Sequence, residues 1–211
     1  MRDCGSECFG GRVSGVSTVA TRVLLCILLN KGLLLRVSSI DSAQWYYNEE
    51  SCGKAIKDFL STHPELTRED IFFTTKLQGN TSYDGTRRAI RSSIEKTGLR
   101  YLDLYLLHSP YGGAQKRGEC WRAVADAVEA GEVRAGGVSN FGLSHLREFF
   151  HRDREPGRRP VVNQIEVHPF NTNEEIVSTA APASMIRRLT LIGRPPSAAT
   201  MVSRSKHTPR L

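Results

Sequence analysis

The chain has 211 residues, of which 39% are hydrophobic and 24% charged, and its formal net charge at pH 7 is +7. This length supports one domain with a sizeable core or two small domains, and the composition is typical of a folded, soluble protein. The charge is uneven: residues 178–211 hold six basic residues and no acidic one, whereas residues 41–177 hold 18 basic and 20 acidic ones. The basic isoelectric point therefore does not identify the whole protein as a nucleic-acid binder.

The cysteines form no C-x-x-C pair, which argues against a zinc knuckle or a thioredoxin-type motif. They are five in number and scattered: Cys4, Cys8, Cys26, Cys52 and Cys120. A reducing compartment is the default for such a chain, so we expect a cytoplasmic protein. The apolar run at residues 23–29 is shorter than the roughly 20 residues of a membrane span, so no membrane association is predicted. A buried element is favoured there over the core of a weak signal peptide.

Apolar, β-branched runs alternate with segments of helical spacing along the middle of the chain. Strands are predicted at residues 35–40, 71–77, 102–108, 133–140 and 161–167. Helical faces are predicted at residues 52–60, 89–97, 121–128 and 143–150, with a sixth helix starting at Asn173. Gly98 and Gly131 follow two of these faces and act as stop signals. The later strands begin about 30 residues apart, which is typical of βα units around a parallel sheet.

Two architectures fit this alternation: a doubly wound sheet and a (β/α)₈ barrel of the TIM type. No G-x-G-x-x-G motif follows any predicted strand, which counts against a dinucleotide-binding doubly wound sheet. Polar residues gather at the C-terminal ends of successive strands, where barrels build their active sites. Eight βα units need about 250 residues. We therefore predict an α/β barrel over residues 36–177 that lacks its last two units, an unassigned head at 1–35 and a basic, disordered tail at 178–211.

Three successive predicted strands end in chemically complementary groups: Asp41, Lys76 and His108. Tyr46 follows Asp41 by five residues. A Lys ammonium beside a Tyr hydroxyl favours the phenolate and lowers the phenol pKa from about 10, while a carboxylate holds the cation. A nearby His can donate to a substrate oxygen, so the set suits protonation of a carbonyl that becomes an alkoxide. A structural ion-pair cluster is the alternative, and Tyr47 is a rival for the role of Tyr46.

Several segments in order resemble the aldo-keto reductase family. The matching segments are residues 40–49, 75–77, 102–110, 137–141 and 163–169. The resemblance covers roughly residues 36–177. It implies a (β/α)₈ barrel that reduces aldehydes or ketones with a nicotinamide cofactor, usually NADPH, without a metal. A small-molecule carbonyl compound is then the expected partner, and the oligomeric state stays open.

The resemblance also implies roles for individual residues. It assigns Tyr46 as the proton donor, Lys76 and Asp41 as its activating pair, and His108 as the residue that orients the substrate. Trp45, next to the donor, is expected to line the substrate pocket. The cofactor is expected to contact Asp41 and three later residues, which match those that hydrogen-bond the nicotinamide carboxamide: Ser139, Asn140 and Gln164.

Both ends of the chain depart from the family pattern. The family's N-terminal hairpin and Gly-rich first strand have no counterpart in residues 1–36. A strand-seven aromatic, a later Lys/Arg/Ser cluster for the cofactor phosphates and a C-terminal loop are not recognisable beyond residue 177. A misread exon, a frameshift and a truncated gene all fit this change. We therefore expect weak NADPH binding, little turnover and association through open strand edges. A non-catalytic remnant of the family is the alternative function, and a nucleic-acid-binding tail without aromatic residues is disfavoured.

Overall fold

The computed structural model describes residues 39–152 and 158–179. The predicted head at residues 1–35, the apolar run at 23–29 and all but the first two residues of the predicted tail lie outside this part. The start of the first predicted strand, residues 35–38, lies outside it as well. Of the cysteines, the described part contains Cys52 and Cys120, which are both buried thiols.

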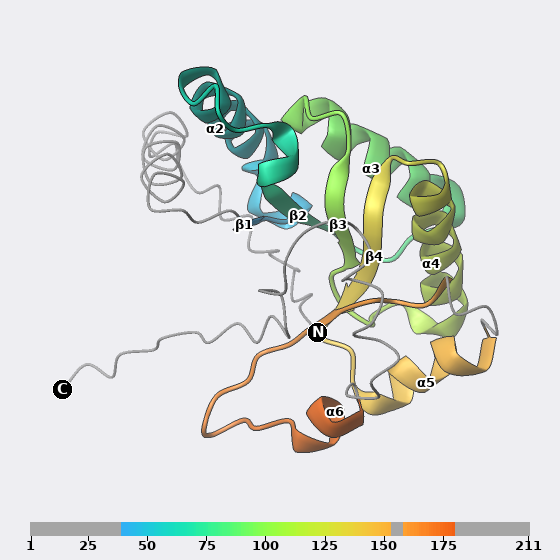
Figure 1. The fold of residues 1–211 in the computed structure, drawn as a ribbon. Helices are drawn as coiled ribbons and strands as arrows, with labels where there is room; N and C mark the ends of the chain where they lie inside the picture. Colours follow the sequence, from blue (N-terminus) through green and yellow to red (C-terminus); the bar gives the residue numbers. More distant parts are fainter. Residues whose placement is uncertain (1–38, 153–157, 180–211) are drawn as a thin grey trace, which may run out of the picture.

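The described residues form strands and helices in alternation (Figure 1). The strands are β1 (Ser39–Asp41), β2 (Phe72–Leu77), β3 (Leu102–Leu107), β4 (Val133–Ser139) and β5 (Asn163–Gln164). The α-helices are α2 (Glu49–Thr62), α3 (Tyr83–Thr97), α4 (Gly113–Glu129), α5 (Leu143–Arg152) and α6 (Glu174–Thr179). Two 3₁₀ turns, η1 (Gln44–Tyr46) and η2 (Arg68–Asp70), precede α2 and β2.

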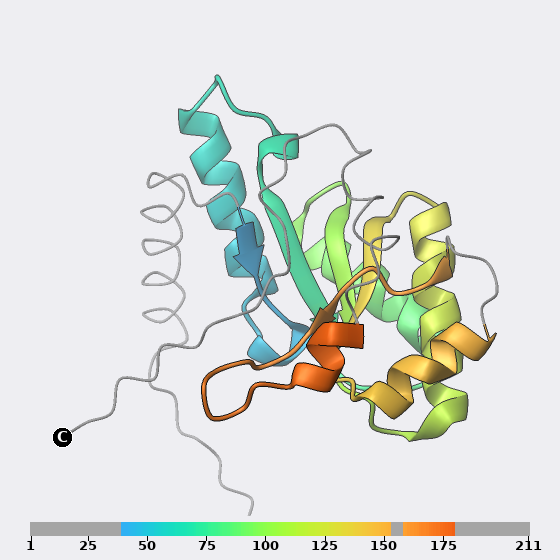
Figure 2. The same ribbon diagram turned by 60° about the horizontal axis from the view of Figure 1, so that its bottom comes forward.

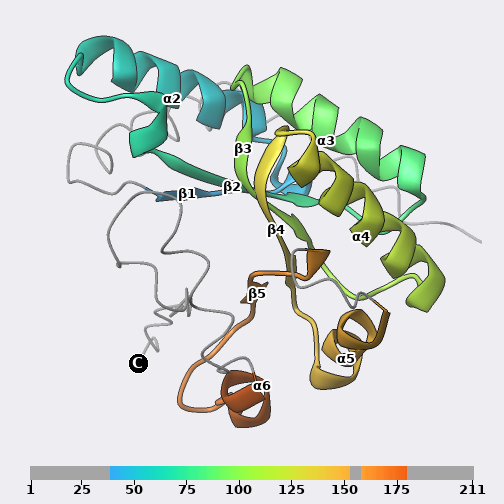
Figure 3. The same ribbon diagram turned by 45° about the vertical axis from the view of Figure 1, so that its right-hand side comes forward.

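The five described strands are all parallel and lie side by side in chain order, β1-β2-β3-β4-β5. The sheet curves, as Figures 1 and 2 show from two directions. Helices α2, α3 and α4 lie along one face of the sheet (Figure 3). A doubly wound sheet would reverse its strand order and carry helices on both faces. The described residues therefore form part of a (β/α)₈ barrel, which confirms the predicted fold class.

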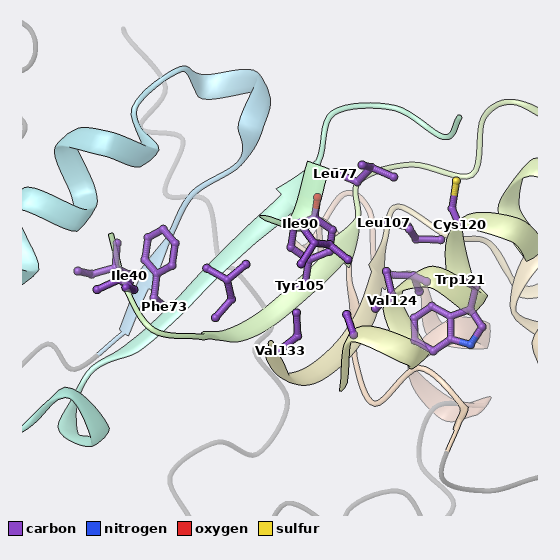
Figure 4. Packing of buried hydrophobic residues seen from close by; sticks show 14 of the residues in the cluster. Ile40, Phe73, Leu77, Ile90, Tyr105, Leu107, Cys120, Trp121, Val124 and Val133 are labelled. Atoms are coloured by element: carbon purple, nitrogen blue, oxygen red, sulfur yellow. The ribbon is translucent and has the colours of Figure 1, made fainter. Parts of the chain in front are cut away.

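The hydrophobic core lies between the sheet and these helices. Side chains on the outward face of the strands, such as Phe73 and Tyr105, pack with Ile90 of α3 and Val124 of α4 (Figure 4). All four are fully buried. Because successive residues of a strand point to opposite faces, the residues between these core positions face the inside of the barrel. The pairing of Asp41 with Thr74 puts both on that inner face, which is where the site lies.

The described helices are longer than their apolar faces predicted, because their first turns are polar. Helix α3 begins after Ser82, whose hydroxyl accepts a hydrogen bond from the Gly85 backbone N–H at 3.1 Å. It ends at Gly98, which has φ 59° and was predicted as the stop signal. The last predicted strand was too long: β5 has two residues, Asn163 and Gln164, and pairs with Val138 and Ser139 at the end of β4.

Candidate active site

The sheet register brings Asp41 and Lys76 together at the C-terminal edge. Asp41 is the last residue of β1, and Lys76 lies two positions further along β2 than Thr74, the partner of Asp41. The Lys76 Nζ donates a hydrogen bond to Asp41 Oδ1 and a second one, at 2.9 Å, to the Ser42 carbonyl. The Lys76 side chain is 2% exposed and that of Asp41 is 38% exposed. A buried cation is therefore held by a carboxylate that solvent can reach.

Tyr46 lies beside this pair because the chain turns sharply after β1. Residues 44–46 form η1, and Figure 2 shows the chain leaving β1 through this turn before it enters α2. The Lys76 Nζ lies 5.4 Å from the Tyr46 ring centroid. The ring meets the His108 imidazole edge-on, with the centroids 5.9 Å apart. The four residues that the sequence predicted as a catalytic set are thus neighbours in space.

Tyr47, the rival of Tyr46, points elsewhere. It has a left-handed backbone conformation with φ 53° and is 75% exposed. Its hydroxyl accepts a hydrogen bond of 3.4 Å from Gln78 Nε2. Among the described residues, the Tyr46 ring is the one that contacts both His108 and Lys76.

The pKa of Tyr46 moves in the direction opposite to the one predicted. Partial burial raises the pKa of the Tyr46 phenol, and the nearby Asp41 carboxylate raises it further. The expected lowering by Lys76 was wrong because the two causes that act on the phenol, burial first and then the Asp41 charge, both disfavour the phenolate. Burial and then the Lys76 charge lower the pKa of His108, while Asp41 opposes them. The site therefore favours a neutral phenol beside a neutral imidazole near pH 7.

The predicted carboxamide-binding residues lie along the same edge of the sheet. Ser139 Oγ donates to the Gln164 carbonyl at 3.0 Å, and Asn140 Nδ2 donates to the His108 carbonyl at 3.0 Å. Gln164 Nε2 donates to Asp41 Oδ2 at 2.7 Å, which links this group to the Lys76 pair. Asn140 has φ 62°, a conformation that Asn tolerates better than most residues.

The side chains of Asn140 and Gln164 are suited to bind the NH2 group of a nicotinamide carboxamide. The amide nitrogens of Asn140 and Gln164 make the contacts above. No described residue donates a hydrogen bond to their side-chain oxygens. Two such oxygens at the inner edge can accept the two N–H bonds of a primary amide. The donor set is thus compatible with the nicotinamide end of the cofactor.

Trp45, predicted to line a substrate pocket, is 59% exposed on η1, directly before Tyr46. Sequence analysis missed Ser42 and Gln44. Ser42 contributes its backbone carbonyl, which carries no sequence signal. Gln44 Nε2 donates to Ser93 Oγ at 2.9 Å and to the Ala89 carbonyl at 3.0 Å, so it ties η1 to α3. The one sequence signal that could have indicated Gln44 is its place as a polar residue in the turn before Tyr46.

Within residues 39–152 and 158–179, no group of three or more His, Cys, Asp or Glu side chains has a geometry that could hold a metal ion. No helix in the same part is long and apolar enough to cross a membrane.

The model of the aldo/keto reductase family matches residues 28–207, so the chain belongs to this family. An uncharacterized oxidoreductase of Schizosaccharomyces pombe is 48% identical over 138 residues, which are 65% of this chain and 48% of that protein. The glyoxal reductase of Bacillus subtilis is 41% identical over 139 residues, or 65% of this chain and 47% of its own length. The chain thus spans about half the length of the curated relatives that it matches.

Solved structures give the same family. An aldo/keto reductase from Brucella melitensis superposes with a TM-score of 0.67 at 36% identity, covering 75% of this chain and 59% of that one. A Bombyx mori aldo-keto reductase in complex with NADP has a TM-score of 0.64 at 31% identity and covers 85% and 56%, respectively. The resemblance to the family is therefore confirmed by both sequence and fold.

Proposed function

We propose that the chain acts as an NADPH-dependent reductase of small aldehydes or ketones, with Tyr46 as the proton donor. The observation that carries this proposal is the buried Lys76 ammonium, which pairs with Asp41 and lies 5.4 Å from the ring of a half-exposed tyrosine. Family membership and the relative named as a glyoxal reductase support the reaction class. The structure titled as a complex with NADP supports the type of cofactor.

When bound, the cofactor would supply a hydride to the carbonyl carbon, which no side chain can provide. Ser139, Asn140 and Gln164 would hold its carboxamide end. The hydroxyl of Tyr46 would give its proton to the carbonyl oxygen, so that an alcohol and a transient phenolate result. Lys76 would stabilise that phenolate, and solvent can return the proton because Tyr46 is half-exposed.

His108 would orient the carbonyl oxygen between its imidazole and the Tyr46 hydroxyl. A neutral imidazole can donate one N–H to that oxygen. The lowered pKa of His108 supports the neutral form, as expected beside the Lys76 cation. Trp45 would then form one wall of the substrate pocket.

A non-catalytic family remnant is disfavoured, because the ion pair, the donor tyrosine and the carboxamide-binding residues all keep their mutual contacts. Cys52 and Cys120 are buried thiols in the described part, as is typical of a protein in a reducing compartment, so we extend the proposal to a cytoplasmic protein.

The proposal is tested in two measurements on the 211-residue chain. NADPH is first titrated while the fluorescence of Trp45 and Trp121 is followed. Oxidation of NADPH at saturating concentration is then measured with methylglyoxal or glyoxal as the probe substrate. As predicted from the sequence, we expect quenching that saturates only at high NADPH concentration and slow turnover. We expect Tyr46→Phe to keep the quenching but lose the turnover. Turnover that survives in Tyr46→Phe, or the absence of quenching at millimolar NADPH, would contradict the proposal.

A further inference from the structure

The segment that follows β3, residues 108–111, has all four of its backbone carbonyls held by side chains of other elements. Asn140 Nδ2 donates to the carbonyl of His108 at 3.0 Å. Asn80 Nδ2 donates to the carbonyls of Ser109 at 2.8 Å and Tyr111 at 2.7 Å. Arg117 donates to the Pro110 carbonyl at 2.6 Å. A segment without regular secondary structure is thus fixed in place by hydrogen bonds from three directions.

These donors are themselves held by the framework of the barrel. Arg117, in α4, is 9% exposed and makes two hydrogen bonds to Glu148 of α5, at 2.6 and 3.1 Å. Asn140 comes directly after β4. Asn80 lies four residues beyond Lys76, in the loop between β2 and α3, and is the donor that spans two carbonyls. The position of the segment is therefore fixed by side chains that follow β2, follow β4 or belong to α4.

Packing does not replace these hydrogen bonds. Tyr111 is 80% exposed, so its side chain buries little area that could hold the segment. Gly112 and Gly113 follow with φ 98° and 86°, conformations that glycine adopts without strain. Without its side-chain donors, this part of the chain would have several accessible conformations.

We propose that Asn80 is a positioning residue that holds His108 and Tyr111 at the substrate end of the barrel. The carbonyls it binds flank Pro110 and begin one residue after the imidazole that contacts Tyr46. Fixing them fixes the direction in which His108 enters the site and places the exposed Tyr111 ring at its rim. This role rests on the proposed function, since the reaction is what a precisely placed imidazole serves.

The first test needs no activity. Backbone amide order parameters of Ser109, Tyr111 and Gly112 are measured by NMR in the wild type, Asn80→Ala and Asn80→Asp. The Asp variant keeps the size of the side chain but, when ionised, cannot donate to a carbonyl. We expect values near 0.85 in the wild type, falling toward 0.6 or below in both variants. Gln115→Ala is the control, because it removes an exposed amide of α4 that donates only within its own helix.

The second test separates positioning from folding. We expect kcat for the probe carbonyl to fall about tenfold in both Asn80 variants, with KM changed less than about twofold and the thermal midpoint close to that of the wild type. Unchanged order parameters would overturn the proposal whatever the activity. A loosened loop with unchanged kcat would overturn it as well. Loss of order in variants of a wild type that shows no turnover would contradict the proposed function but leave the anchoring role of Asn80 standing.

Discussion

The two edges of the sheet each carry an acid paired with a cationic side chain, and the two acids differ in access to solvent. At the C-terminal edge, Asp41 is 38% exposed and pairs with Lys76. At the N-terminal edge, Asp103 of β3 is 3% exposed and accepts hydrogen bonds from Arg68 at 2.6 Å and from the Phe73 backbone N–H at 2.9 Å. Burial raises the pKa of Asp103, although these donors and the Arg134 charge oppose it.

This contrast separates a structural network from a site that can do chemistry. Arg68 and Arg134 both stack on the Tyr101 ring, at 4.4 and 4.0 Å from its centroid. The charged groups of the N-terminal cluster therefore contact one another and the same ring. Ion pairs of both kinds perturb pKa values, and a perturbed pKa alone does not identify function. At the C-terminal edge, by contrast, a tyrosine and a histidine face the pair and water can enter. In βα barrels, that edge is the catalytic one.

The largest effect expected at the open edge concerns the donor. Tyr46→Phe should lower turnover by about 10²–10⁴-fold, because it removes the general acid, while the fold stays intact. Tyr47→Phe is the matched control and should be nearly silent, since its hydroxyl makes one long hydrogen bond to Gln78. Steady-state NADPH oxidation measures both. Equal losses in the two variants would show that the wrong tyrosine is assigned.

A crossed pair of variants sharpens the comparison of the two acids. Asp103→Asn should lower the free energy of unfolding by about 3 kcal/mol, because Arg68 stays buried without its charge partner. Asp41→Asn should cost less, about 1 kcal/mol, because the Lys76 Nζ keeps its hydrogen bond to the Ser42 carbonyl and water can take the place of the 38%-exposed carboxylate. Urea unfolding followed by tryptophan fluorescence measures both changes.

Turnover should respond to the same variants in the opposite order. Asp41→Asn should lower it strongly, whereas folded Asp103→Asn should keep it, because Asp103 contacts no residue of the proposed site. An equal loss of turnover in both variants would remove the distinction between the edges.

The grouping of the proposed catalytic residues could be predicted because strand ends of parallel units meet at one edge. Asp41, Lys76 and His108 each end or follow a predicted strand, so their order in the chain sufficed to bring them together. The ion pairs of Asp103 with Arg68 and Arg134 had no such signal. These partners are more than 30 residues away in either direction, and their meeting depends on the position of η2 and on the pairing of β4 with β3.

Side chains that bind backbone carbonyls could not be predicted from the sequence either. Asn80 and Arg117 bind carbonyls of the segment after β3, and every residue type offers such an acceptor. The predicted pKa of Tyr46 was wrong for a related reason. The pattern showed that Lys76 and Asp41 would be near, but only the geometry shows that burial and the Asp41 carboxylate both raise the pKa of Tyr46.

The smallest expected effect is a change in the titration of His108, which the Lys76 and Asp41 charges move in opposite directions. Burial and Lys76 lower its pKa below the ordinary value of 6.5, while Asp41 raises it and Tyr46 is the remaining titratable neighbour. Because the folded-state pKa lies below the unfolded one, the stability contributed by neutral His108 is fully present above pH 6.5. It is lost as the pH falls through the lowered value.

Variants of the pair should move this titration with opposite signs. Lys76→Met removes the repelling cation and should raise the pKa of His108, whereas Asp41→Asn removes the attracting carboxylate and should lower it further. The imidazole signal in an NMR titration from pH 4 to pH 8 reports both shifts, and the signal of His63, the residue that caps the C-terminal end of α2, serves as the internal control. The absence of a shift in both variants would mean that burial alone sets the pKa of His108. The Lys76–Asp41 pair would then have no electrostatic effect on His108, and the contrast with the cluster around Asp103 would be lost.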